Sequence, residues 1–76
     1  MKICQAAEQF KSGLLEEVQL RKNPGDVRQW FVMLCKVNGK SLMLADEQDQ
    51  PIVDDDLARL VEMLKGIGCR EVRVFL

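Results

Sequence analysis

The sequence predicts one α+β domain built as a two-layer sandwich, with two helices on one face of a three-stranded, mainly antiparallel sheet. Three observations support this fold: an apolar stripe at helical spacing near the start, an Asn-Gly turn between two β-prone segments, and a capped helical segment followed by an alternating strand. The expected element order is αββαβ. A chain of 76 residues leaves room for a single domain, residues 1–76.

The first helix is expected over residues 3–21. Its apolar positions recur at spacings of 4, 3, 4 and 4, which is one stripe of a helix with 3.6 residues per turn. These positions are Ile3, Ala7, Phe10, Leu14 and Val18. The segment Asn23-Pro24-Gly25-Asp26 predicts the end of this helix, because proline disfavours helical geometry in the residue before it.

A β-hairpin is expected from strands at 27–37 and 40–45, joined by Asn38-Gly39. Asn-Gly favours a two-residue type I′ turn, which needs positive φ at both positions. The resulting register places Cys35 opposite Leu42 and Met33 opposite Leu44. One hairpin face then carries Phe31, Met33, Cys35, Leu42 and Leu44, and the other carries Trp30, Val32, Leu34, Met43 and Ala45.

The remaining elements are a helix at 54–66, with Asp54 as its N-cap, and a strand at 70–76. The last strand is expected beside 27–37 in an antiparallel pair, so the sheet order is 2-1-3 and the most apolar strand is central. The residues expected to be most buried are Phe10, Leu14, Leu57, Leu60, Leu64, Val72 and Val74.

The run from Trp30 to Cys35 contains no polar residue, although a strand exposed on one side normally alternates. An apolar sheet face left uncovered by the helices favours a small protein-interaction module of unknown process that forms a homodimer or binds another protein. The sequence leaves open which hairpin face the helices cover, and a three-layer arrangement with one helix on each face is the alternative. The candidate contact residues are Phe31, Met33, Cys35, Leu42 and Leu44, with Trp30 and Phe75 as further candidates.

Nucleic-acid binding is the alternative function, because aromatic residues on a sheet can stack bases and strand-end cations can hold phosphates. The candidate residues are Arg28, Lys36, Lys40, Arg70 and Arg73. The formal net charge of −1 argues against this reading, since most nucleic-acid-binding domains are basic.

No enzyme activity and no cofactor are predicted. The chain has no histidine, no glycine-rich phosphate loop and no nucleophile elbow. The acidic segment 46–56 lacks the ligand order of a calcium loop, and Asp54-Asp55-Asp56 is better explained as a helix cap, so no metal site is expected. The αββαβ order occurs in many small bacterial accessory proteins, but no motif is specific enough to name a family.

The expected location is the cytoplasm, with no membrane contact. Glu8 and Lys11 interrupt any apolar segment of a secretory signal, and no run approaches the roughly 20 residues of a membrane span. The cysteines Cys4, Cys35 and Cys69 are odd in number and lie 31 and 34 residues apart. This spacing indicates reduced cysteines that pack as small hydrophobic residues, not a disulfide framework.

Overall fold

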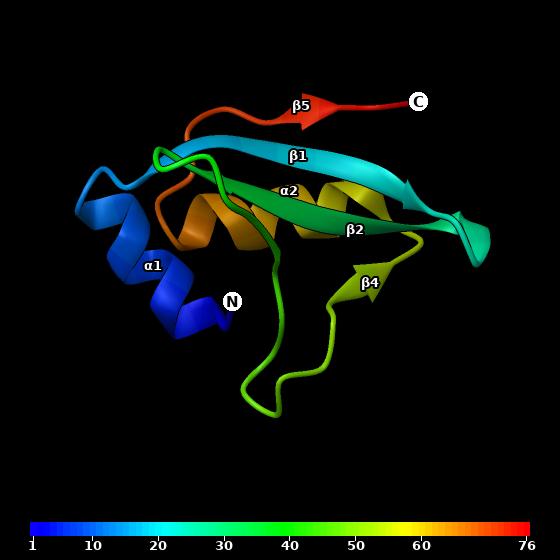
Figure 1. Cartoon of the computed structure of the whole chain (residues 1–76). Helices are drawn as coiled ribbons and strands as arrows, with labels where there is room; N and C mark the ends of the chain where they lie inside the picture. The colour runs from blue at the N-terminus through cyan, green and yellow to red at the C-terminus, as the bar shows by residue number, and fades with distance from the viewer.

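A computed structural model describes residues 1–76 as two helices and a five-stranded mixed sheet (Figure 1). The elements in chain order are α1 (Ile3–Lys11), β1 (Leu15–Asn23), β2 (Asp26–Lys36), β3 (Ser41–Met43), β4 (Val53–Asp54), α2 (Leu57–Gly66) and β5 (Arg73–Val74). The sheet order is β3-β2-β1-β5, and β4 also pairs with β2. All pairs are antiparallel except β1–β5. The α+β class is therefore confirmed, and the predicted αββαβ arrangement is matched in part: the antiparallel pair of the second and third predicted elements is present, but the sheet has five strands and one parallel pair.

The first helix ends at Lys11, ten residues before the predicted end at 21. Gly13 has a φ of 71°, its N–H donates to the Phe10 carbonyl, and the Leu14 N–H donates to the Gln9 carbonyl. These two bonds form a Schellman motif, which ends a helix at a left-handed residue. Because Val18 suits both the helical stripe and a strand that alternates, the apolar spacing alone could not reveal this end.

Asn23-Pro24-Gly25-Asp26 is a hairpin turn between β1 and β2 and not the end of a helix. Asn23 pairs with Asp26, and the Asn23 side-chain oxygen accepts the Gly25 N–H at 3.0 Å. The resulting hairpin pairs β1 with β2 along nearly their whole length, so these two strands form the middle of the sheet (Figure 1).

The C-terminal strand β5 pairs with β1, and the pairing is parallel. Gln19 lies opposite Arg73, and the Phe75 N–H donates to the Leu20 carbonyl at 2.8 Å. The predicted antiparallel pair between 70–76 and 27–37 is wrong because β1 already occupies that edge of β2. The 27–37 segment is still central, since β3 and β4 pair with the other edge of β2.

The β2–β3 hairpin has a register one residue away from the predicted one: Leu34 lies opposite Leu42, and Met33 lies opposite Met43. The Lys36 N–H donates to the Lys40 carbonyl, so the loop contains three residues, and its last residue, Gly39, has a φ of 91°. Three-residue loops of this kind are common and need only one left-handed residue. A shift of one residue in the pairing moves every side chain of β3 to the other face of the sheet.

Both helices pack on the same sheet face, as predicted. Ala6 of α1 and Leu60 of α2 belong to one apolar cluster with the buried side chains of β1 and β2. The cluster consists of Ala6, Val18, Leu20, Val32, Leu34, Leu44, Leu60, Leu64 and Cys69. Figure 1 shows α2 passing behind these strands. Burial of each large apolar side chain contributes about 1.5–3 kcal/mol, so this small cluster supplies most of the stabilisation.

Several predicted core residues are less buried than expected. Leu60 and Leu64 are fully buried, whereas Phe10, Leu57 and Val72 are only half-buried at the margin of the core. The predictions for Leu14 and Val74 are wrong, with 41% and 39% exposure. Leu14 follows the end of α1, and Val74 lies on an edge strand.

The second helix begins at Leu57, three residues later than predicted. Asp56, and not Asp54, is its N-cap: the Asp56 carboxylate accepts the N–H groups of Ala58 and Arg59. Asp54 lies in β4 instead, opposite Trp30 of β2. An N-cap side chain satisfies donors that have no partner within the helix, which explains why the helix begins where Asp56 can do so.

Replacing Gly13 with alanine is expected to lower the free energy of unfolding by about 1–2 kcal/mol, since a Cβ disfavours the left-handed conformation. A Cβ at this position meets no atom within 4 Å, so the change in the free energy of unfolding comes from backbone strain alone. Gly66→Ala is the matched control, because it also meets no atom but lies in α2 without a positive φ. Denaturant unfolding measures both variants. Equal stability of the two would contradict the left-handed turn as the end of α1.

Candidate functional site

The sheet face opposite the helices is the candidate functional site, here called the uncovered face. Side chains alternate between the two faces of a strand, so the neighbours of the core residues Val18, Leu20, Val32 and Leu34 point away from the helices. Residues paired across strands share a face. The uncovered face therefore consists of Glu17, Gln19, Arg21, Phe31, Met33, Cys35, Ser41, Met43, Val53, Arg73 and Phe75.

The uncovered face is apolar over β2 and the edge strands β3 and β4. Met33 of β2 lies opposite Met43 of β3, and Phe31 lies opposite Val53 of β4. Phe31 is only 8% exposed although it lies outside the core cluster, so it adds little accessible surface. Met43 and Val53 are 37% and 39% exposed and form the accessible part of this apolar strip.

Three of the five predicted contact residues lie on this face: Phe31, Met33 and Cys35. The placement of Leu42 and Leu44 is wrong, because the three-residue loop turns both toward the helix side. Leu44 is fully buried in the core, and Leu42 is 39% exposed at the sheet edge. Sequence reasoning missed Met43 and Val53. Gly39 could have indicated the placement of Met43, because the length of this loop sets the register of the next strand. Glycine suits the third position of a three-residue loop as well as a type I′ turn.

A chain of hydrogen-bonded polar side chains runs along β1 on the uncovered face. The Gln19 Nε2 donates to Glu17 at 3.1 Å, and the Arg21 Nε donates to the Gln19 Oε1 at 2.8 Å. Arg73 of β5 approaches Glu17 at 3.4 Å. Gln19 thus links an anionic end, Glu17, to a cationic end, Arg21. We call the Glu17–Gln19–Arg21 chain the polar ladder.

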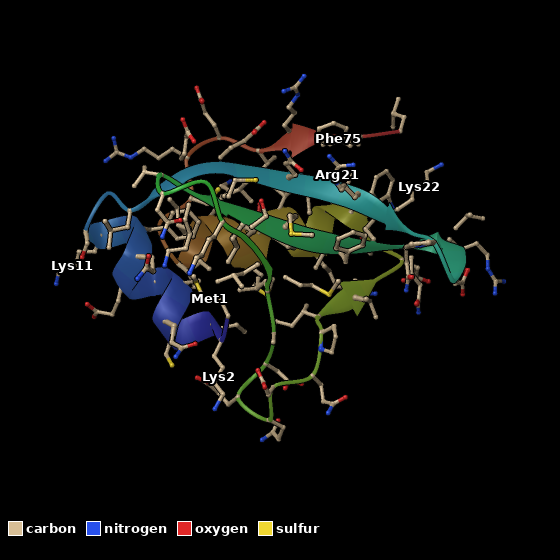
Figure 2. All side chains as sticks on the ribbon, in the orientation of Figure 1. Met1, Lys2, Lys11, Arg21, Lys22 and Phe75 are labelled. Atoms are coloured by element: carbon tan, nitrogen blue, oxygen red, sulfur yellow. The ribbon has the colours of Figure 1, made fainter.

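Cationic side chains stack on aromatic rings near the cationic end of the polar ladder. The Arg21 guanidinium lies 3.9 Å from the centroid of the Phe75 ring, and Arg73 lies 5.2 Å from it. Lys22 lies 5.7 Å from the Trp30 ring, on the helix side of the sheet. Figure 2 shows Arg21, Lys22 and Phe75 gathered at one end of the sheet, far from Lys11 of α1. Cation–π contacts of this kind hold long side chains in place.

The residues predicted for nucleic-acid binding do not form one surface. Arg28 lies near the β1–β2 turn, whereas Lys36 and Lys40 lie at the far end of β2, about 26 Å away at the usual rise of a strand. Arg70 follows α2, and Arg73 lies on β5. Arg28 also pairs with Asp26 at 3.3 Å, and this bond lowers the pKa of the Asp26 carboxyl.

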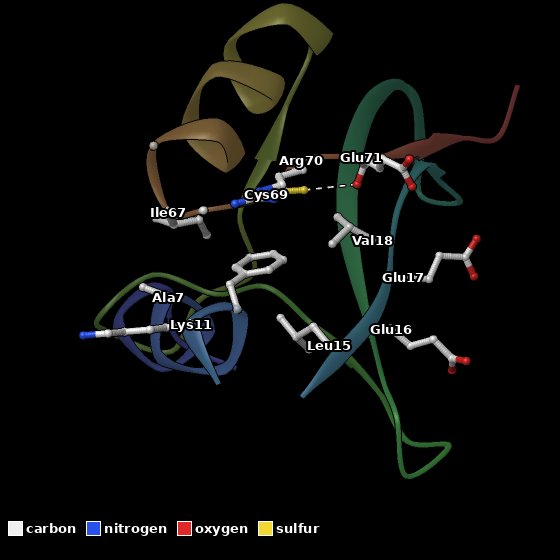
Figure 3. A pocket seen from close by; sticks show the side chains of 13 residues that line it. Ala7, Lys11, Leu15, Glu16, Glu17, Val18, Ile67, Cys69, Arg70 and Glu71 are labelled. Carbon is white, nitrogen blue, oxygen red and sulfur yellow. Dashed lines mark hydrogen bonds between the residues drawn. The ribbon is translucent and has the colours of Figure 1, made fainter. Parts of the chain in front are cut away.

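The largest cleft, about 830 Å³, lies between α1, the first half of β1 and the segment after α2 (Figure 3). The Cys69 thiol borders this cleft and donates to the Glu71 carbonyl at 3.2 Å. Burial raises the pKa of Cys69, so the thiol stays protonated. The carboxylates of Glu16 and Glu17 point away from this sulfur in Figure 3. The Cys69 thiol of this cleft is therefore not activated as a nucleophile.

The three cysteines are free and lie in different environments. Cys69 is buried and Cys35 half-buried, whereas Cys4 is exposed, so the expectation that all three pack as hydrophobic residues is wrong for Cys4. The Cys4 thiol donates to the Glu47 carboxylate at 3.5 Å, and this bond raises the pKa of Cys4. The raised pKa values of Cys4 and Cys69 both favour the protonated thiol over the thiolate.

Comparisons of the chain with protein-family models, curated proteins and solved structures give no match. Neither α1 nor α2 has the length and hydropathy needed to cross a bilayer. No group of three or more cysteine, aspartate or glutamate side chains is arranged to hold a metal ion.

Asp54 and Arg59 form the best-defined ion pair in the molecule, and it fixes β4 to α2. The Arg59 Nη2 and Nε donate to the two Asp54 carboxylate oxygens at 2.8 and 3.0 Å, and the Asp56 N–H donates to the same carboxylate. The hydrogen bond from Arg59 lowers the pKa of Asp54 to about 2. Since β4 carries Val53, this pair also positions one edge of the uncovered face.

Asp54→Asn is expected to lower the melting temperature at pH 7, because the folded state holds the ionised carboxylate with its pKa at about 2 instead of 3.8. When folding lowers the pKa of a carboxyl group, the resulting stabilisation is fully present at a pH above the pKa of the unfolded state. It is lost as the pH falls through the pKa of the folded state. The difference between wild type and variant should therefore shrink between about pH 4 and pH 2. Asp55→Asn, at an exposed position, is the control and should change less. A difference that is constant with pH would contradict this role.

Proposed function

We propose that this protein is a small cytoplasmic protein-interaction module that binds its partner through the uncovered face. The observation that carries the proposal is the apolar strip of Met33, Met43 and Val53, which runs along β2 and the edge strands β3 and β4 on a sheet face without helices. A strip of this kind costs free energy in water, since each exposed Å² of apolar surface is unfavourable by about 25 cal/mol.

The arrangement of side chains on the face supports protein binding. Protein interfaces combine an apolar centre, often rich in aromatic residues, methionine and arginine, with a polar rim. On the uncovered face, the apolar residues of β2 and of the edge strands β3 and β4 lie beside the polar ladder of β1, so an apolar part and a polar part are adjacent. Methionine is unbranched and flexible, so a pair of methionines adapts its shape to an apolar partner surface.

Met43→Lys is expected to abolish partner binding, because it places a charge in the centre of the apolar strip. Leu42→Lys is the matched control: Leu42 is adjacent and similarly exposed, but it lies on the other side of the sheet. Affinity capture with tagged wild type and both variants measures binding. We expect the same bound protein with wild type and Leu42→Lys, and none with Met43→Lys. Equal capture by the two variants would rule out the uncovered face as the binding surface.

A second candidate function is binding of single-stranded nucleic acid, which the Arg21–Phe75–Arg73 stack favours. Two guanidinium groups around one aromatic ring offer both phosphate contacts and a stacking surface. Against it, Glu17 already neutralises Arg73.

Fluorescence titration with a labelled single-stranded oligonucleotide distinguishes the two functions. We expect no saturable binding near physiological salt. Binding that is tight at 50 mM salt, at least about 10³-fold weaker at 200 mM, and lost in Arg21→Glu would instead establish the nucleic-acid function, since counterion release makes such complexes strongly salt-dependent.

A further inference from the structure

The side chains of the uncovered face form three rows across the sheet. The central row contains Gln19 of β1, Met33 of β2 and Met43 of β3, which lie opposite one another in the register. Two residues further along β1 and β2 lie Arg21 and Phe31, with Phe75 beside Arg21, and Val53 of β4 lies opposite Phe31 to complete a second row. Two residues in the other direction lies the third row, Glu17, Cys35 and Ser41.

The two outer rows are complementary to each other in charge and in size. Arg21 in one row corresponds to Glu17 in the other, at the same distance from Gln19. Phe31 corresponds in the same way to the small side chain of Cys35. Val53 corresponds to Ser41. One row is therefore cationic and bulky, and the other is anionic and small, with the methionines between them.

We propose that the uncovered face binds a second copy of this chain across a two-fold axis that runs along the central row. A two-fold interface is isologous, so a residue on one side of the axis meets the residue at the equivalent position on the other side. Arg21 of each copy then lies over Glu17 of the other copy, and Phe31 lies over Cys35. This inference rests on the proposed function, since it names the protein that the face binds.

The polar ladder gives this dimer its electrostatic match. Gln19 holds Glu17 and Arg21 at opposite ends of the ladder through bonds of 3.1 and 2.8 Å. The two-fold axis places the ladders of the two copies head to tail, with each positive end over a negative end. Complementary charges determine register and exclude other orientations more than they add affinity. Arg73 lies at the edge of the central row, where its bond to Glu17 holds it away from its own symmetry copy.

The available area agrees with a dimer. The two longer Cα extents of the molecule are 32 and 25 Å. A rectangle of these dimensions covers about 800 Å² and is an upper limit for the uncovered face, so the interface can reach at most about standard size. Only 11 of the 76 residues are buried in the single chain, so a second copy would enlarge a small core. Oligomerisation is a common means of stabilising domains of this size.

Sedimentation equilibrium of the full chain at about 1–100 µM tests the proposal, a range that covers the weaker interfaces of this size. We expect twice the 8.7 kDa of one chain for wild type. Arg21→Glu and Glu17→Arg should each raise the dissociation constant at least about tenfold, because like charges then face each other. The double variant Arg21→Glu/Glu17→Arg should dimerise again, because the ion pair between the two copies forms with the two charges exchanged. Lys22→Glu is the matched control on the other sheet face and should leave the dimer intact.

Mixing two variants tests the axis itself and remains informative if Glu17→Arg does not fold. Met43 lies on the proposed axis, so Met43→Glu and Met43→Lys should each be monomeric alone and form a heterodimer when mixed. A monomeric wild type at every concentration would overturn the second copy as partner, while the capture comparison of Met43→Lys with Leu42→Lys still decides the proposed function. A dimer equally tight in Arg21→Glu and Lys22→Glu, or no heterodimer on mixing, would overturn the two-fold axis.

Discussion

The left-handed turn at Gly13 is the constraint on which the rest of the fold depends. It ends α1 through the bonds from the Gly13 and Leu14 N–H groups, and it releases the following residues into β1. Without that turn, Val18 would continue a helical stripe and β2 would lack its long antiparallel partner. Because β5 pairs only with β1, the C-terminal strand would also lose its place in the sheet. The left-handed turn at Gly13 thus marks the point where the helix ends and the first strand of the central pair can begin.

The uncovered face follows from alternation along β1 and β2. Each strand places apolar side chains toward the helices, but they differ on the other side. β1 presents Glu17, Gln19 and Arg21 there, whereas β2 presents Phe31 and Met33. The face is therefore amphipathic across the strands, and the charges along β1 also change sign from one end to the other. Both properties are needed for a surface that complements itself under a two-fold rotation, and both arise from the register of one hairpin.

The candidate site could be predicted from the sequence in part. The unbroken apolar run from Trp30 to Cys35 indicated correctly that β2 has apolar side chains on both faces, and Phe31, Met33 and Cys35 follow directly from strand parity. The positions of Leu42 and Leu44 could not be derived in the same way. They depend on whether Asn38-Gly39 forms a two-residue or a three-residue loop, and both loops suit that dipeptide. Hydrophobicity did not separate the two registers, because Leu42, Met43 and Leu44 are all apolar.

The sequence by itself determined the α+β class, the central position of the strand at 27–37 and the helix that ends in Gly66. These features rest on apolar periodicity and turn residues. Only the tertiary structure decided that residues 15–23 form a strand, that β5 joins it in parallel, which face of the sheet the helices cover, and that Met43 and not Leu42 lies on the uncovered face. The physical reason is that these choices depend on hydrogen bonds between strands and on packing against the helices, which no single segment specifies. A spacing of four residues fits a helix and a strand alike until a neighbouring strand supplies the partners.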